Sequence, residues 1–464
     1  MSRVILVSPP NTSMLDPRIG PPLGLLYLIG WARAHGHDTS GWEVIDLNVE
    51  CFPSGPGGPK GHWTHDFSLT RCMAEIPEGA DVYGIQLASM QFPHAVAIAE
   101  ALRVREPDAL LVCGGSHASA MPGECAEWFD VVVTQEGEEA FVEAIEDREM
   151  YKARWRAAGS GFTLRGRPVE PLDSLPFPAR DLLDWSRYTR KIAGERATNI
   201  ITTRGCPARC NFCQQESLWG KGLRMQHPER ILAEVDFIKE TTGITNLLFL
   251  DDSLTARRRE DMRALCDGLR ARGVKWRGWT RANLCVRKGD DDLLQYMADS
   301  GCQAICVGVE GGTDKVLKAM DKGTTVRMNE IALRRIAATG MSARCSIMVG
   351  NPTETWEDVL ALVDFVERNR DHVADWILSS YVPLPGTPSW DHPERFGMII
   401  DKARARRERY RHFFVVGGEE QSGLVHSYAD GTGPEDIQAR HDFVQEALLR
   451  LAPRNRKKVT IGAA

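Results

Sequence analysis

Short apolar runs alternate with helical patterns along residues 1–150 of the chain. Five of the runs predict β-strands, at Val4–Ser8, Glu43–Leu47, Val82–Leu87, Leu110–Gly114 and Val131–Val133. Apolar positions at helical spacing fall between them, as at Leu23–Ala34 and Ala95–Arg105. Because alternating strands and helices with short connections form βαβ units, we predict a doubly wound parallel sheet over residues 1–160. A segment rich in proline and glycine at 52–63 is predicted as a loop.

The alternation stops at a proline-rich stretch and then resumes with a longer period. Residues 161–194 show no sustained periodicity, which predicts a linker. Between 195 and 395 six further strands are predicted, at Asn199–Thr203, Asn246–Leu250, Lys275–Thr280, Ala304–Val309, Ala343–Val349 and Trp376–Tyr381. Helical patterns follow the first five, so this segment is predicted to form a partial (β/α)6 barrel with its chemistry at the carboxyl ends of the strands. Residues 396–464 are predicted as a small, charged, mostly helical region that could act as a lid.

The composition is that of an ordinary globular protein. Apolar residues make up 43% of the 464 residues, and the formal net charge is −6, so we do not expect a nucleic acid as a partner. No stretch approaches the roughly 20 apolar residues of a membrane span, and the N-terminus lacks the pattern of a signal peptide. The 12 cysteines then indicate a reducing compartment, and we expect a cytoplasmic protein.

Three of the cysteines differ from the rest in their spacing. Cys206, Cys210 and Cys213 form a C-x3-C-x2-C pattern on the loop that leaves the first predicted barrel strand. Thiolates are soft ligands that suit zinc or an iron–sulfur cluster. A structural zinc ion needs four ligands, and no fourth cysteine or histidine lies at motif spacing. A cubane with three protein ligands leaves one iron open, so the pattern favours a [4Fe–4S] cluster over a zinc site.

This loop, which reads C-x3-C-x-F-C, resembles that of the radical S-adenosylmethionine (radical SAM) superfamily. The resemblance covers roughly residues 195–395 and implies a TIM-like partial barrel whose open iron binds S-adenosylmethionine. It also implies that one electron cleaves the sulfonium and that the resulting 5′-deoxyadenosyl radical abstracts a hydrogen from the substrate. An electron donor of the flavodoxin or ferredoxin type is an implied partner. By the same resemblance Phe212 packs near the adenine, although an apolar residue there could simply close the loop.

Further landmarks of the resemblance follow later strands. Asp251 and Asp252 come after the second predicted barrel strand. Because successive side chains point to opposite faces, only one of them is expected to face the barrel, and Asp252 is favoured as the contact near the amino group of S-adenosylmethionine. Arg281 and Glu310 follow the third and fourth strands and are similar to the ribose and carboxylate contacts of the family. The alternatives are helix capping by Asp252 or Ser253 and structural ion pairs for Arg281 and Glu310.

The turn after the fifth predicted barrel strand reads GNPTET over residues 350–355. It resembles the adenine-contacting turn of the family, where Gly350 would let the backbone approach the ligand closely. We expect Glu354 to cap the next helix rather than to contact a substrate.

The N-terminal half carries a second resemblance, to the cobalamin-binding subclass of radical SAM enzymes. The residues that show this resemblance lie on loops after predicted strands. The candidate cofactor-binding residues on these loops are Pro22, Leu23, Gly24, Gly114, Gly115, His117, Glu136 and Gly137. Doubly wound, Rossmann-like folds bind ligands at such loops. The D-x-H-x-x-G motif that supplies an axial histidine to cobalamin elsewhere is absent. The resemblance therefore leaves two alternatives, a base-off cobalamin or a scaffold that has lost it, and His117 is more often a packing residue than a ligand.

Three functions remain open at this point. With cobalamin, the resemblance implies methylation of a carbon centre in a small-molecule substrate, and the composition favours a natural product such as an antibiotic. Without it, the same radical could drive dehydration, deoxygenation or rearrangement of an amino sugar or similar polyol. That lyase-type reaction needs an acid or a base, for which Glu310, Asp251 and Tyr381 are the candidates. A non-catalytic iron–sulfur or cobalamin sensor would explain the cysteines, but not the polar residues at successive strand ends.

Overall fold

The computed structural model describes residues 2–451 except Ser13, Leu15, 53–65, Lys288, 290–291 and 411–423. The loop predicted at 52–63 therefore lies almost entirely outside the described residues. The chain divides into two compact units, the first containing residues 1–190, 214–220 and 240–243, and the second containing 191–213, 221–239 and 244–464. No helix in the described ranges is long and apolar enough to span a membrane.

The first unit is built on a six-stranded parallel sheet. Its strands are β1 (Val4–Ser8), β2 (Trp42–Asp46), β3 (Val82–Gln86), β4 (Leu110–Gly114), β5 (Val131–Thr134) and β6 (Phe162–Arg165). They follow the order β2-β1-β3-β4-β5-β6, and every neighbouring pair is parallel. The chain order reverses between β1 and β3, so the predicted doubly wound fold is confirmed. The pattern did not predict β6, an edge strand that is only half-buried along its length.

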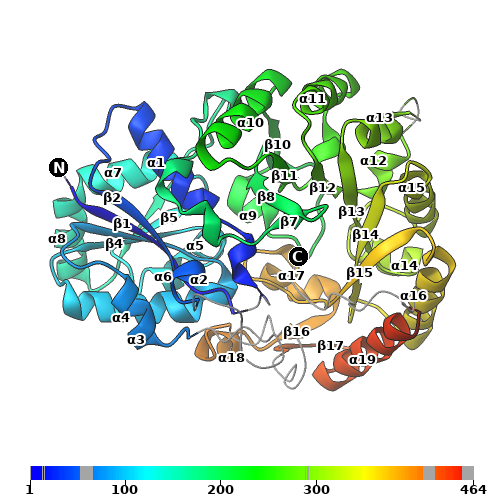
Figure 1. The fold of residues 1–464 in the computed structure, drawn as a ribbon. Helices are drawn as coiled ribbons and strands as arrows, with labels where there is room; N and C mark the ends of the chain where they lie inside the picture. Colours follow the sequence, from blue (N-terminus) through cyan, green and yellow to red (C-terminus); the bar gives the residue numbers. More distant parts are fainter. Residues whose placement is uncertain are drawn as a thin grey trace. The chain divides into compact units, whose positions relative to one another are not determined.

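Helices cover both faces of this sheet. They are α1 (Leu23–Ala34), α2 (Leu47–Glu50), α3 (Leu69–Glu75), α4 (Phe92–Arg105), α5 (Ser116–Ala120), α6 (Pro122–Cys125), α7 (Glu138–Glu146) and α8 (Arg148–Ala158). Figure 1 shows α1 and α7 on one side of the strands and α3 and α4 on the other. The central strand β1 is buried along its whole length, as expected for a parallel strand covered on both faces.

The second unit contains the predicted half-barrel. Its strands are β7 (Lys191–Ile192), β8 (Glu195–Ile200), β11 (Asn246–Phe249), β12 (Trp276–Thr280), β13 (Cys302–Glu310), β14 (Ser342–Val349) and β15 (Val373–Ser380). From β8 to β15 each strand lies beside the previous one in the sheet and runs parallel to it. The predicted strand Asn199–Thr203 is in fact two strands, because β8 ends at Ile200 and β9 (Thr203–Cys206) pairs with β10 (Gly222–Met225) as a separate hairpin.

Helices surround the outer face of the half-barrel (Figure 1). They are α10 (Pro228–Thr242), α11 (Arg259–Ala271), α12 (Ala282–Cys285), α13 (Leu293–Asp299), α14 (Asp314–Ala319), α15 (Val326–Ala338) and α16 (Trp356–Asn369). Two short helices lie elsewhere: α9 (Gln215–Trp219) belongs to the first unit, and α17 (Pro388–Asp391) donates a backbone hydrogen bond to Asn211 of the cysteine loop. Alternate strand residues such as Ile305, Val307 and Ile347 join the core beneath the surrounding helices. The intervening residues of the same strands therefore face the interior of the half-barrel.

The C-terminal region contains strands as well as helices. β16 (Met398–Ile400) and β17 (His426–Tyr428) form an antiparallel pair, and the helices are α18 (Lys402–Arg407) and α19 (Pro434–Leu451). Val444 and Leu448 of α19 are buried in the core of the half-barrel. This helix is thus part of the packed layer around the strands.

Candidate functional site

The three cysteines of the C-x3-C-x2-C pattern lie on the loop that follows β9. Cys206 is the last residue of β9. Cys210 is buried, whereas Cys206 and Cys213 are half-buried. Arg281 donates a hydrogen bond from Nη1 to the Sγ of Cys210 over 3.3 Å. The thiols therefore lie together on one loop at the carboxyl end of the parallel strands, with a guanidinium beside them.

This donor set fits an iron–sulfur cluster. Within the part of the chain that the structure describes, no three histidine, cysteine, aspartate or glutamate side chains converge on the position of a single metal ion. A [4Fe–4S] cubane does not need ligands that converge on one point, because each thiolate binds a different iron atom. Three thiols on one loop can each bind one iron atom, and thiolates are the usual ligands of such clusters.

Asn211, inside the same loop, holds it against the half-barrel. Its backbone N–H donates to the carbonyl of Met320 over 3.1 Å, and its side-chain amide donates to the carbonyl of Ala319 over 2.8 Å. The hydroxyl of Tyr381 donates to Asn211 Oδ1 over 2.8 Å, and its ring lies edge-on to that of Phe212. Burial raises the pKa of Tyr381. These contacts favour a role for Tyr381 in holding the loop over a role as acid or base.

Asp251 is occupied by the backbone that leads into the cysteine loop. Its Oδ1 accepts hydrogen bonds from the N–H groups of Thr202, over 2.6 Å, and Thr203, over 2.8 Å. Arg257 pairs with the same carboxylate at 3.8 Å and donates to the carbonyl of Gln226 over 2.7 Å. All of these groups are buried. The arrangement favours a positioning role for Asp251 over the acid–base role that the sequence left open.

We expect Asp251→Asn to loosen this segment. An amide keeps the size of the carboxylate but loses its charge and part of its accepting capacity, and an unsatisfied buried donor costs about 1–3 kcal/mol. The variant should show a lower thermal unfolding temperature and a lower iron content after anaerobic reconstitution. Asp261→Asn is a suitable control, because it removes an ion pair with the exposed Arg258 on neighbouring α11. Unchanged stability and iron content in Asp251→Asn would contradict the positioning role.

Asp252 is half-buried and directly follows Asp251. Burial and the charge of Asp251 raise the pKa of Asp252 to about 7. The short helix after it, Leu254–Ala256, begins at Ser253 without a side-chain capping bond, so the capping alternative is not realised. Asp252 remains our candidate for a contact with an amino group.

Glu310 and Lys322 form a buried ion pair at the end of β13. Nζ of Lys322 donates to Oε1 of Glu310 over 2.7 Å, and each residue is 5% exposed. Lys322 also lies over the ring of Phe212, 5.7 Å from its centroid, and its carbonyl accepts a hydrogen bond from Arg281. One lysine that sequence reasoning missed thus connects three residues that it singled out. This is the structural ion pair that was predicted for Glu310 as the alternative to a contact with S-adenosylmethionine.

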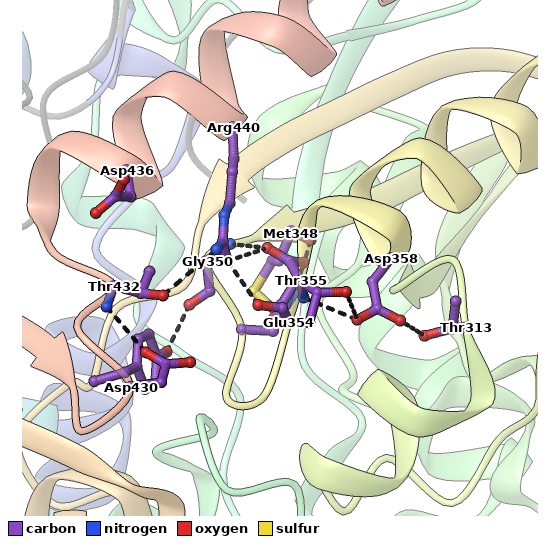
Figure 2. Close-up of polar contacts among 12 residues, drawn as sticks. Thr313, Met348, Gly350, Glu354, Thr355, Asp358, Asp430, Thr432, Asp436 and Arg440 are labelled. Atoms are coloured by element: carbon purple, nitrogen blue, oxygen red, sulfur yellow. Dashed lines mark hydrogen bonds and ion pairs between the residues drawn. The ribbon is translucent and has the colours of Figure 1, made fainter.

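The prediction that Glu354 caps α16 is wrong. Asp358 occupies that role, since it accepts hydrogen bonds from the N–H of Thr355 over 2.9 Å and from its hydroxyl over 3.0 Å. Glu354 folds back instead: Oε2 accepts from the N–H of Gly350 over 2.6 Å and Oε1 from the side chain of Asn351 over 2.8 Å (Figure 2). Thr355 and Asp358 form a Thr-x-x-Asp capping box that begins one residue after Glu354. Glu354 therefore closes the turn instead of capping the helix.

In the first unit the candidate cobalamin residues follow β1, β4 and β5. Pro22, Leu23 and Gly24 form the start of α1, Gly114 and Gly115 the end of β4, and Glu136 and Gly137 the turn before α7. Because the strands are parallel, these loops share the carboxyl edge of the sheet. The strand order reverses at this edge, between β1 and β3, which is where doubly wound sheets bind ligands.

Small residues and an unpaired acceptor mark the same edge. A Cβ on Gly24 would stand 3.1 Å from Oε1 of Gln86, and that buried oxygen has no hydrogen-bond partner among the described residues. Gly115 has a φ of +111°, and a Cβ there would stand 2.6 Å from the carbonyl oxygen of Leu87. Buried polar atoms without a partner are rare, and a corrin carries amide groups that can donate to one. The residues present therefore fit a cobalamin.

His117 lies in the interior of the first unit. It is fully buried, its Nδ1 is 3.0 Å from the hydroxyl of Ser89, and its ring packs on Phe92 with centroids 4.4 Å apart. Burial lowers the pKa of His117 to about 3. Glu136 likewise accepts a hydrogen bond from the backbone of Val169 over 3.1 Å. Both contacts favour packing roles over direct contact with a cofactor.

Known protein families match both units. Residues 200–366 match the model of the radical SAM superfamily, and residues 17–145 match that of the B12 binding domain. The chain contains a radical SAM domain. This radical SAM protein thus carries an N-terminal domain of the cobalamin-binding type. The two domains agree with the cofactors that the sequence predicted, a [4Fe–4S] cluster, S-adenosylmethionine and cobalamin.

Several relatives of this radical SAM protein are named methyltransferases. The uncharacterized methyltransferase PH0819 of Pyrococcus horikoshii is 27% identical over 410 residues, covering 84% of this chain and 83% of the relative. Cytidylyl-2-hydroxyethylphosphonate methyltransferase of Streptomyces wedmorensis is 24% identical and covers 95% and 90% of the two chains. The structure of the radical SAM methyltransferase TsrM from Kitasatospora setae, which holds cobalamin and a [4Fe–4S] cluster, aligns with a TM-score of 0.66 and 18% identity over 100% of this chain and 91% of that one. The last comparison shows a shared fold.

Proposed function

We propose that this chain is a cobalamin-dependent radical SAM methyltransferase that methylates a carbon centre of a small-molecule substrate. The observation that carries the proposal is the loop of three cysteines at the carboxyl end of the parallel half-barrel, with Arg281 donating to one of the thiols. The second domain, of the B12-binding type, and the named methyltransferase relatives support methyl transfer over the dehydration that the sequence left open.

The described residues would bind and orient the cofactors. Cys206, Cys210 and Cys213 would hold the cluster, and an N–H donor on a cluster sulfur, here from Arg281, makes the cluster easier to reduce. Once bound, the cofactors would supply a carbon radical that abstracts a hydrogen and a methyl group that replaces it. Asp252 would contact the amino group of S-adenosylmethionine.

The proposal assigns a role to each predicted domain of the chain. Residues 1–160 would bind cobalamin and residues 195–395 would form the radical SAM barrel. Residues 161–194 would lead from one domain to the other, although β6 and the residues up to Arg190 belong to the first compact unit. Residues 396–464 would form the C-terminal region. A flavodoxin or ferredoxin would deliver the electron, because the cluster must reach a low reduction potential. A natural product is the substrate class that we favour.

The test is anaerobic purification from cells supplied with cobalamin, followed by iron and cobalt assays. We expect stoichiometric cobalt, a [4Fe–4S] absorption spectrum, and release of 5′-deoxyadenosine and S-adenosylhomocysteine when S-adenosylmethionine and a reductant are added. Both products are needed, since one reports radical formation and the other reports methyl transfer.

Two results would contradict the proposal in different ways. A cobalt-free protein that still releases 5′-deoxyadenosine would favour the dehydration or rearrangement that the sequence left open. A protein that binds iron and cobalt but releases neither product would favour a sensor.

A further inference from the structure

The turn after β14, residues 350–355, has a backbone conformation that contacts from residues outside the turn must hold. Gly350 has a φ of +74° and Thr353 a φ of +64°. The left-handed region is unfavourable for a β-branched residue such as threonine. Residues in such conformations persist only where the surrounding structure holds them, and they concentrate at functional sites. The contacts around this turn therefore show what maintains it.

One support is Arg440 of α19. Its Nη1 donates to the carbonyl oxygen of Glu354 over 2.9 Å and lies 3.5 Å from the carboxylate Oε2. Arg440 is 5% exposed and Glu354 is 4% exposed. Figure 2 shows the guanidinium reaching from α19 to the turn. Since Glu354 itself accepts from the N–H of Gly350, the arginine fixes the carboxylate that closes the turn.

Two further residues of the same region contact Gly350. The hydroxyl of Tyr428, on β17, donates to the carbonyl oxygen of Gly350 over 2.6 Å. Ile437, on α19, lies so close that a Cβ on Gly350 would stand 2.5 Å from its Cγ2. The glycine is therefore required by its neighbours as well as by its backbone angle, and both neighbours come from residues 424–451.

The same region also reaches the side of the site that carries the cysteine loop. The ring of His426, on β17, lies edge-on to those of Tyr381 and Tyr428, with centroids 6.4 Å and 5.8 Å away. Tyr381 in turn contacts Phe212 and Asn211. Residues 424–451 therefore contact the turn at 350–355 directly and Phe212 through Tyr381, the two parts of the barrel that are expected to enclose the adenine.

We propose that Tyr428 of β17 and Ile437 and Arg440 of α19 support the S-adenosylmethionine site, and that Arg440 is a positioning residue for the turn at 350–355. The inference rests on the proposed function, together with the family resemblance that places this turn next to the adenine. Arg440 does not touch the ligand. It acts through Glu354, whose carboxylate fixes the direction of the Gly350 N–H and therefore the backbone that faces the adenine.

The test is the affinity for S-adenosylmethionine of anaerobically reconstituted full-length protein without reductant, measured by equilibrium dialysis. We expect Arg440→Met to raise the dissociation constant about 10- to 100-fold, because a charge-assisted hydrogen bond to a buried group is lost. The rate of 5′-deoxyadenosine release at saturating S-adenosylmethionine should change by less than about twofold, since the reacting atoms are not involved. Arg440→Lys, which keeps one charged donor, should recover part of the affinity.

Val444→Ala is the matched control on the same helix. Val444 is fully buried in the core of the half-barrel, so its truncation lowers stability without touching the turn. We expect this variant to bind S-adenosylmethionine like wild type. Tyr428→Phe gives an independent arm if Arg440→Met folds poorly, and it should weaken binding several-fold.

The outcomes separate this proposal from the one on which it rests. Wild-type affinity in Arg440→Met and Tyr428→Phe would overturn the positioning role while leaving the radical SAM assignment intact. Equal losses of affinity in Val444→Ala and Arg440→Met would also overturn it, because a general loss of stability would then explain both. Failure of the wild-type protein to bind S-adenosylmethionine would overturn the proposed function itself.

Discussion

Cys210→Ala is expected to abolish both the [4Fe–4S] absorption and the release of 5′-deoxyadenosine. Cys210 is the buried member of the three thiols and accepts the hydrogen bond from Arg281. An alanine leaves the cluster with two protein ligands and leaves the guanidinium beside an apolar group. Iron content, the visible spectrum and nucleoside release after anaerobic reconstitution measure the effect, and each should fall to background.

Cys266→Ala is the control for this experiment. Cys266 lies on α11 and is fully buried in the core beneath the helices, so the substitution removes a thiol without changing the cysteine loop. It should retain iron and activity with at most a modest loss of stability. If Cys210→Ala kept its nucleoside release, the assignment of the cluster to this loop would be wrong.

The first fold unit was predictable because the central strands of its sheet are buried on two faces. Such strands read as continuous apolar runs, and β1 and β4 have the predicted boundaries. The sequence missed β6, because the residues of this edge strand alternate between half-buried and exposed and form no apolar run. The predicted strand at 199–203 also joined β8 to the start of β9, because Thr202 and Thr203 continue the β-branched pattern. In the structure Asp251 accepts hydrogen bonds from the N–H groups of these two residues, which breaks the strand.

The site could be predicted only where a motif fixes the spacing. The cysteine loop is such a motif. Lys322, Arg257 and Arg440 carry no local signal, because each acts on residues far away in the sequence, and a lone basic residue is usually an exposed one. Glu354 shows the converse problem: its position before a helix suggested a cap, yet its partners lie within its own turn and on α19. Contacts such as Lys322 with Phe212, Arg257 with Gln226 and Arg440 with Glu354 become apparent only in three dimensions.

Lys322→Met is expected to destabilise the second unit by about 3–5 kcal/mol, the usual cost of leaving one charge of a buried pair without its partner. Glu310 is 5% exposed and its main contact is the ammonium group at 2.7 Å. It also sits in a left-handed conformation, with a φ of +64°, which the surrounding contacts must hold. Calorimetric unfolding should show a large downward shift of the transition that belongs to the second unit.

A double variant separates the charge from the packing. Glu310→Gln combined with Lys322→Met removes both charges, so it should be more stable than Lys322→Met alone. Lys275→Met is the surface control: its pair with Glu195 is exposed, and breaking it should cost no more than about 1 kcal/mol. A Lys322→Met variant that unfolds like Lys275→Met would show that Glu310 does not depend on the ammonium group. Because the same ammonium group lies over the ring of Phe212, a real dependence would mean that one lysine side chain supports two candidate site residues, Glu310 and Phe212.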